Sequence, residues 1–145
     1  MAKKFLGVHI IAELHGCDPA LLDDEKFITD ILLQAAKETK VTVVDCVSRK
    51  FEPQGISVVV IVSESHIAIH TWPELRYAAL DFYTCGEKDP EEAVRRISEK
   101  LDTKDLILFR AERGNVRKIK SINTKINREI PDGADKRSEQ IQILL

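Results

Sequence analysis

Apolar residues recur at helical spacing in two stretches of the chain. After Asp23 or Asp24, apolar positions three and four apart run through residues 27–36 with polar residues between them, which is the period of an aspartate-capped amphipathic helix. The second stretch begins at residues 89–92, where an aspartate, a proline and a glutamate three after the aspartate are typical of a helix start. The pattern therefore predicts two amphipathic helices.

Six apolar segments rich in β-branched residues predict strands. They cover residues 5–14, 41–47, 56–62, 66–70, 77–83 and 106–109. The uninterrupted apolar runs at 41–47 and 56–62 predict strands that are buried on both faces. Strands and helices follow one another as β-α-β-β and then β-β-α-β. This order predicts an α+β fold, a two-layer sandwich in which two helices cover a mainly antiparallel sheet.

Composition narrows the class of protein. The 145 residues favour one domain, and 22 lysines and arginines nearly balance 24 aspartates and glutamates, so the net charge of -2 gives no sign of nucleic-acid binding. No apolar run approaches the roughly 20 residues needed to cross a bilayer. Three cysteines are an odd number and argue against a secreted disulfide framework. We expect a cytoplasmic protein that binds neither nucleic acid nor membrane.

The last part of the chain differs in charge. After Phe109 there are nine basic and five acidic residues, and no aromatic residue lies among them. Binding of single-stranded nucleic acid combines basic residues with aromatic ones. We therefore interpret residues 115–145 as a basic C-terminal extension that is mobile or packed at an edge.

Reactive side chains concentrate between Ser57 and Cys85. His66 and His70 are four residues apart, which would suit a metal on a helix, but the residues between them favour a strand. On a strand the two residues lie about 13 Å apart, too far for one ion. We expect no metal site.

A hydrolase is the second option for these residues. Ser65 or Cys85 would be the nucleophile and His66 or His70 the base. No Gly-x-Ser-x-Gly elbow is present, and a serine beside a histidine is a weak signal. Cys85 differs from the other two cysteines, because it follows a strand and precedes a glycine, where loops present functional groups.

The string from Glu64 to Glu74, with Thr84-Cys85-Gly86 after it, closely resembles the prokaryotic S-adenosylmethionine decarboxylase proenzymes. The likeness extends from residues 6–18 through 51–57 to 112–114. It implies that residues 1–114 are a pyruvoyl-dependent decarboxylase domain. It also implies that the chain cuts itself between Glu64 and Ser65 into a beta chain, 1–64, and an alpha chain, 65–145.

Roles for single residues come from the same resemblance. Ser65 would become the pyruvoyl group that forms a Schiff base with the substrate amine, and Ser57 and His70 would assist the cleavage. Cys85 would return a proton after CO2 leaves. Substrate contacts would come from Phe51, which would stack on adenine, and from Glu74, which would hydrogen-bond the ribose.

The resemblance further implies a homodimer of cleaved protomers, with sites that both protomers can share. The activity that the resemblance implies for this chain is the conversion of S-adenosylmethionine to decarboxylated S-adenosylmethionine and CO2 for spermidine synthesis. Ser65 and His70 are an odd number of residues apart, so one straight strand would place them on opposite faces. A site within one chain therefore needs a bend between them, or a Ser65 that cleavage frees.

Some positions depart from the family pattern. Val8, Val58 and the pair Leu75-Arg76 stand where the family usually has arginine, glycine and tyrosine-glycine. These positions lie near the expected pocket, and relatives with the same machinery decarboxylate arginine or ornithine. Both substrates therefore stay open as alternatives. A third alternative is a binding or partner subunit that keeps the fold and does not process.

Overall fold

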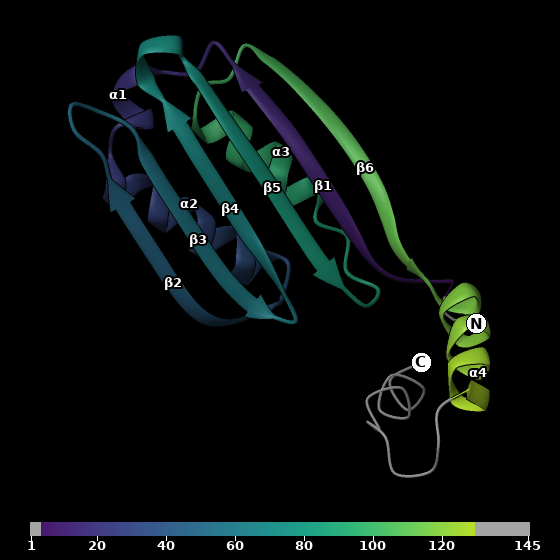
Figure 1. Ribbon diagram of the computed structural model, residues 1–145. Coiled ribbons are helices and arrows are strands. Elements are labelled where there is room, and N and C mark those ends of the chain that lie inside the picture. The colour runs from purple at the N-terminus through teal and green to yellow at the C-terminus, as the bar shows by residue number, and fades with distance from the viewer. Residues whose placement is uncertain (1–3, 130–145) are drawn as a thin grey trace.

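The computed structural model describes residues 4–129, in which one six-stranded sheet has helices on one face (Figure 1). The strands are β1 (Phe5–His15), β2 (Thr42–Lys50), β3 (Ile56–Ser63), β4 (Ser65–Trp72), β5 (Tyr77–Cys85) and β6 (Asp105–Asn115). Their order across the sheet is β2-β3-β4-β5-β1-β6, and every neighbouring pair is antiparallel. The predicted antiparallel α+β fold is confirmed, although β6 continues well beyond the predicted residues 106–109.

Two helices, α2 (Glu25–Glu38) and α3 (Glu91–Lys100), cover the sheet as predicted. The Asp24 carboxylate caps α2 by accepting a hydrogen bond from the Phe27 amide at 3.0 Å. Asp89 accepts one from the Glu91 amide at 3.0 Å, so α3 begins just after the predicted proline rather than at it.

Three short or terminal elements were not predicted. These are α1 (Pro19–Leu22), a 3-10 turn η1 (Pro73–Leu75) and α4 (Val116–Glu129). The last of these places the first part of the basic extension in a helix beyond the end of β6 (Figure 1). Residues 130–145 of that extension lie outside the described residues.

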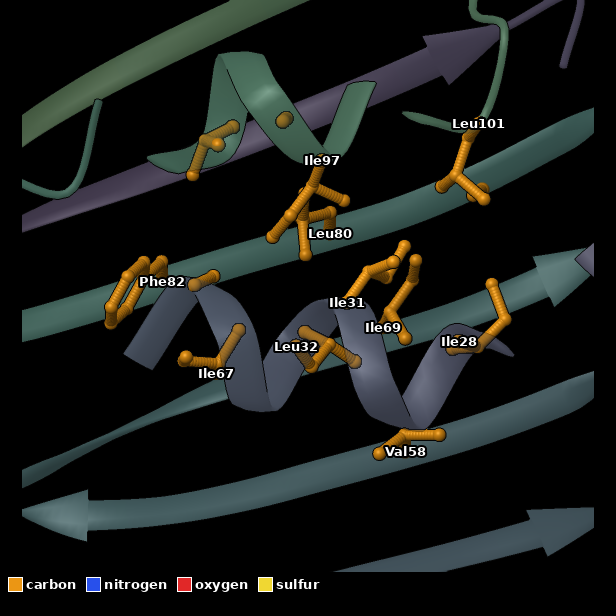
Figure 2. Packing of buried hydrophobic residues seen from close by; sticks show 14 of the residues in the cluster. Ile28, Ile31, Leu32, Val58, Ile67, Ile69, Leu80, Phe82, Ile97 and Leu101 are labelled. Atoms are coloured by element: carbon orange, nitrogen blue, oxygen red, sulfur yellow. The ribbon is translucent and has the colours of Figure 1, made fainter. Parts of the chain in front are cut away.

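The core fills the space between the sheet and the helices. Ile28, Ile31 and Leu32 of α2 point toward strand residues such as Ile67 and Ile69 (Figure 2). All five side chains are at least nine-tenths buried. The period of three and four in α2 meets the period of two in the strands, which is the basis of a two-layer core.

Burial of residues 41–47 and 56–62 on both faces was a wrong prediction. β2 is an edge strand whose side chains are mostly exposed, and β3 alternates, with Val60 fully buried and Ile61 46% exposed. Runs of valine and isoleucine reflect the preference of β-branched side chains for extended backbone. They do not report which faces are covered.

Within residues 4–129 no helix covers the other face of the sheet (Figure 1). Large apolar side chains stay partly exposed on this uncovered face: Ile11, Val47, Val59, Ile61, Ile107 and Phe109. None of the described helices is long and apolar enough to span a membrane. A sheet face that is both apolar and open is typical of an interaction surface.

Candidate active site

Four of the residues singled out in the sequence line one cavity of about 380 Å³: Phe51, Ser57, His70 and Glu74. They come from the β2–β3 loop, from β3, from β4 and from η1. Trp72 adds a second aromatic side chain to the lining. A cavity of this size, with aromatic and polar walls, suits a small-molecule ligand.

Ser57 and His70 form a hydrogen-bonded pair in this cavity. They face each other in the β3–β4 register, and Ser57 Oγ lies 2.7 Å from His70 Nδ1. Strand alternation places both side chains on the uncovered face. A hydroxyl and an imidazole at this distance can pass a proton between them, as general acid–base chemistry requires.

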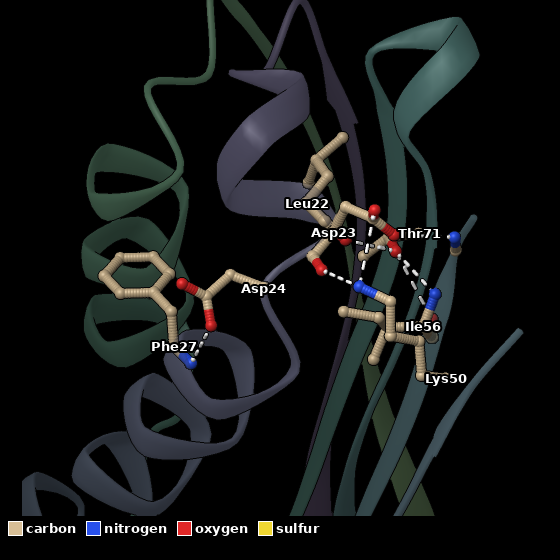
Figure 3. Close-up of polar contacts among 8 residues, drawn as sticks. Leu22, Asp23, Asp24, Phe27, Lys50, Ile56 and Thr71 are labelled. Carbon is tan, nitrogen blue, oxygen red and sulfur yellow. Dashed lines mark hydrogen bonds and ion pairs between the residues drawn. The ribbon is translucent and has the colours of Figure 1, made fainter. Parts of the chain in front are cut away.

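The loop that carries Phe51 is tied to the start of α2 (Figure 3). Asp23 Oδ1 accepts a hydrogen bond from the Gly55 amide at 3.0 Å, and Lys50 Nζ donates to the Asp23 carbonyl at 2.7 Å. The bond from Gly55 is the main reason that the pKa of the Asp23 carboxyl lies below its ordinary value. Gly55 has a φ of 104°, which other residues rarely adopt. The loop is therefore held in one place beside the cavity.

Replacing Thr71 with valine will weaken the fold beneath this loop. Thr71 as a whole residue is only 5% exposed. Its hydroxyl donates a hydrogen bond to the Leu22 carbonyl at 2.7 Å and accepts one from the Ile56 amide at 2.9 Å. Valine keeps the shape and leaves both buried backbone groups unpaired. We expect the free energy of unfolding to fall by about 1–3 kcal/mol. Urea denaturation measures it, with Thr42→Val on the exposed edge strand as the control.

The other candidate residues, Glu64, Ser65 and Cys85, lie near the opposite end of β4. Glu64 stands between the end of β3 and the start of β4, and Ser65 is the first residue of β4. Among the described residues, Ser65 Oγ is the one buried side-chain nitrogen or oxygen without a hydrogen-bond partner. The Cys85 thiol donates to the Glu64 carbonyl oxygen at 3.4 Å. A free hydroxyl and a thiol therefore flank the Glu64–Ser65 peptide bond.

Within one chain the two groups of residues do not meet. Ser57 pairs with His70, and Val62 pairs with Ser65, so the groups are five residues apart along β4. That spacing corresponds to about 16 Å. β4 runs without a break from Ser65 to Trp72, so the bend that a one-chain site needs is absent. Alternation also groups Ser65 with Ile67, on the side of the helices.

A polar cluster on the uncovered face was not predicted from the sequence. Asp81 Oδ2 lies 2.8 Å from His9 Nε2 and 2.6 Å from His66 Nε2. The Arg113 guanidinium donates to His9 Nδ1 at 3.2 Å. Since arginine can only donate, the His9 proton sits on Nε2 and points at Asp81. The signal in the sequence was a histidine and an aspartate inside otherwise apolar strands.

The three groups His9, His66 and Asp81 are close enough together to share a metal ion. Because Arg113 donates to His9 Nδ1, the proton of the His9 ring is on Nε2. A metal ion in this cluster would need the lone pair of that same Nε2 atom, which the proton occupies. The arrangement is that of a hydrogen-bonded cluster. His66 and His70, the pair considered in the sequence, lie four residues apart on β4 as expected.

Comparison with known proteins gives a consistent result. The model of the S-adenosylmethionine decarboxylase family matches residues 8–114. An S-adenosylmethionine decarboxylase proenzyme from Pelotomaculum thermopropionicum is 47% identical over 112 residues, covering 77% of this chain and 89% of the relative. One from Acetivibrio thermocellus is 46% identical over 110 residues, covering 75% and 89%. The crystal structure of the adenosylmethionine decarboxylase from Aquifex aeolicus superposes with a TM-score of 0.74 at 36% identity, covering 79% of this chain and 95% of that one.

Proposed function

This chain belongs to the S-adenosylmethionine decarboxylase family, and from that premise we propose that it cuts itself and then decarboxylates S-adenosylmethionine. The observation that carries the proposal is the Glu64–Ser65 peptide. Its serine hydroxyl is buried and unpaired, and its carbonyl oxygen accepts a hydrogen bond from Cys85. A buried hydroxyl without a partner costs free energy, which is understandable if it is held ready to attack.

Cleavage follows from the chemistry of this peptide. Ser65 Oγ adds to the Glu64 carbonyl carbon, the C–N bond breaks, and the hydroxyl proton passes to the new amine, which leaves an ester. The Cys85 thiol stabilises the oxygen that becomes negative during this step. A base then removes the Ser65 Cα proton, and the Glu64 carboxylate leaves from Cβ. Water hydrolyses the dehydroalanine, which releases ammonia and leaves a pyruvoyl group at the start of β4.

The base and its hydroxyl partner come from a second copy of the chain. The base is His70 and its hydroxyl partner is Ser57, and both lie about 16 Å from Ser65 in their own chain. The uncovered face of the sheet, on which Ser57 and His70 lie, exposes Ile61 to 46% and Phe109 to 56%. Packing this face against the same face of a second chain removes the apolar surface from water and makes a two-sheet sandwich. We therefore propose a homodimer.

The position of the two-fold axis along the strands follows from the spacing of Ser65 and His70 on β4. If the axis lies between the two sheets and crosses the strands near Ala68, the Ser65 end of one β4 faces the His70 end of the other. The group presented to the other chain's His70 is then the Glu64–Ser65 peptide, whose carbonyl oxygen Cys85 reaches from the uncovered face. Each dimer then holds two complete sites, and each site takes Ser65 and Cys85 from one protomer. The partner supplies Ser57 and His70 to that site, together with the cavity that they line.

Substrate binding and substrate protonation are also divided between the two protomers of each site. The pyruvoyl carbonyl supplies an electrophile for the substrate amine and a sink for the electrons left by CO2. Phe51 and Glu74 both line the cavity of about 380 Å³. The aromatic ring of Phe51 stacks on the adenine, and the carboxylate of Glu74 accepts hydrogen bonds from the ribose hydroxyls. Cys85 returns a proton to the substrate carbon, and this role requires a reduced thiol. We therefore propose the cytoplasm as its compartment.

Release of CO2 from carboxyl-labelled S-adenosylmethionine, arginine and ornithine tests the proposed substrate. We expect release from S-adenosylmethionine alone, by protein whose intact mass shows fragments ending at Glu64 and beginning at residue 65. Release from arginine or ornithine without release from S-adenosylmethionine would overturn the substrate and keep the mechanism. A chain that stays whole and releases nothing would instead indicate a binding or partner subunit.

A further inference from the structure

We infer that Tyr83 is a positioning residue for Cys85, and that its hydroxyl donates a hydrogen bond to the Cys85 sulfur. The inference deepens the proposed function, because it concerns the thiol that returns the proton. It is carried by the way in which β1, β5 and β6 bring four residues together.

One row across the sheet contains Arg113, Gly7 and Cys85. Gly7 pairs with Cys85 on β5 and with Arg113 on β6. Tyr83 is two residues before Cys85 on the same face of β5. A Cβ atom at Gly7 would lie 2.9 Å from Tyr83 Cε2, so the tyrosine ring occupies the space above this glycine. The ring therefore leans along β5 toward the level of Cys85.

Arg113 fixes the ring from the other side. Its guanidinium carbon lies 4.8 Å from the centre of the Tyr83 ring, in a cation–π contact. The same guanidinium donates to His9 Nδ1, and the His9 ring lies 5.3 Å from the Tyr83 ring. The phenol is consequently held between Arg113 and Cys85 and has little freedom to turn away.

The protonation state of Tyr83 suits a donor. Burial raises the pKa of the Tyr83 phenol above its ordinary value, and the neighbouring Cys85 raises it further, while Arg113 lowers it by a smaller amount. The charged or titratable groups that face the ring are His9 on β1, His66 on β4 and Arg113 on β6. At neutral pH the hydroxyl keeps its proton and can donate it in a hydrogen bond.

This hydrogen bond matters most when Cys85 is charged. When the S–H bond of Cys85 gives its proton to the carbon that CO2 has left, the electron pair stays on sulfur as a thiolate. Hydrogen bonds to ionised acceptors are roughly twice as strong as those between neutral groups. Tyr83 therefore stabilises the thiolate, and a solvent proton restores the thiol before the next turnover.

Alkylation of Cys85 by iodoacetamide tests the contact without relying on catalysis. The full chain carrying Ser65→Ala is compared with the same chain carrying Tyr83→Phe as well, and peptide mass spectrometry follows Cys85 from pH 6 to 10. We expect Tyr83→Phe to slow alkylation about tenfold at pH 7, because the attacking thiolate loses a hydrogen bond that is stronger to a charged sulfur than to a neutral one. The two rates should converge at high pH.

Two controls separate this effect from a change in structure. Tyr77 is on the same face of β5, and its hydroxyl donates to Glu13 at 2.6 Å, so Tyr77→Phe removes a phenol that has another partner. Cys46, in the same sample, reports any general change in reactivity. Equal Cys85 profiles with and without the Tyr83 hydroxyl would overturn the inference, as would equal slowing by Tyr77→Phe.

The cleaved enzyme gives a second readout. Tyr83→Phe with Ser65 intact should lower kcat about tenfold and leave KM unchanged, since Tyr83 acts through the thiol and the substrate cavity is untouched. An unchanged kcat would contradict the role in turnover. If the wild-type chain decarboxylates nothing while the alkylation rates differ, the proposed function fails and the contact between Tyr83 and Cys85 is retained.

Discussion

A chain in which Ser65 is replaced by alanine will remain at its full mass and release no CO2 from S-adenosylmethionine. The methyl group cannot add to the Glu64 carbonyl, so neither the ester nor the pyruvoyl group can form. The fold should survive, because Ser65 Oγ makes no hydrogen bond that the change would remove. Removing an unpaired buried hydroxyl should even raise the free energy of unfolding slightly. Intact mass and urea denaturation measure the two effects.

Ser63→Ala is the matched control for this variant. Ser63 is the last residue of β3, on the other side of Glu64, and its side chain is exposed. Cleavage of Ser63→Ala should proceed as in the wild-type chain. A Ser65→Ala chain that still yields fragments ending at Glu64 would show that the nucleophile is another residue.

Replacing His70 with alanine will slow cleavage by about 10²–10⁴-fold, the range typical of a positioned acid or base. Ser57 Oγ loses its 2.7 Å partner in this variant, so the change removes the proton-transfer pair from the cavity. The time course of fragment formation, followed by mass, gives the rate. The His70→Ala change leaves Ser65 and Cys85 in place, because both lie near the other end of β4.

His15→Ala is a suitable control for the loss of an imidazole. His15 is exposed at the end of β1 and stacks on Tyr77, with ring centres 5.1 Å apart. It lies outside the cavity that Ser57 and His70 line. Normal cleavage by His15→Ala and by His70→Ala alike would remove His70 from the reaction.

Local pattern was enough to predict most of the fold. The aspartate caps, the apolar period of the helices and the strand segments all report on interactions between residues near in sequence. Burial was harder to predict, because the valine-rich β2 lies at an edge of the sheet and β3 has one open face. Which strand lies at an edge depends on the order of the strands, and a local pattern does not contain that order.

The candidate site divides in the same way. Counting along β4 predicts that Ser65 and His70 lie on opposite faces, and β4 is unbroken between them. The row formed by Arg113, Gly7 and Cys85 could not be predicted, because it exists only when β1 pairs with both β5 and β6. The Asp81 cluster depends on the pairing of β5 with β1 and with β4. Long-range register, which single-sequence patterns do not encode, creates these contacts.

Co-expression of Ser65→Ala and His70→Ala chains tests most directly whether two protomers share each site. A mixed dimer has one site in which Ser65 of the His70→Ala chain meets Ser57 and His70 of the Ser65→Ala chain. We predict that fragments 1–64 and 65–145 form from the His70→Ala chain, in about half of its molecules if the chains pair at random. No fragments should form from the Ser65→Ala chain. If co-expression leaves the His70→Ala chain as intact as it is alone, the shared site is contradicted.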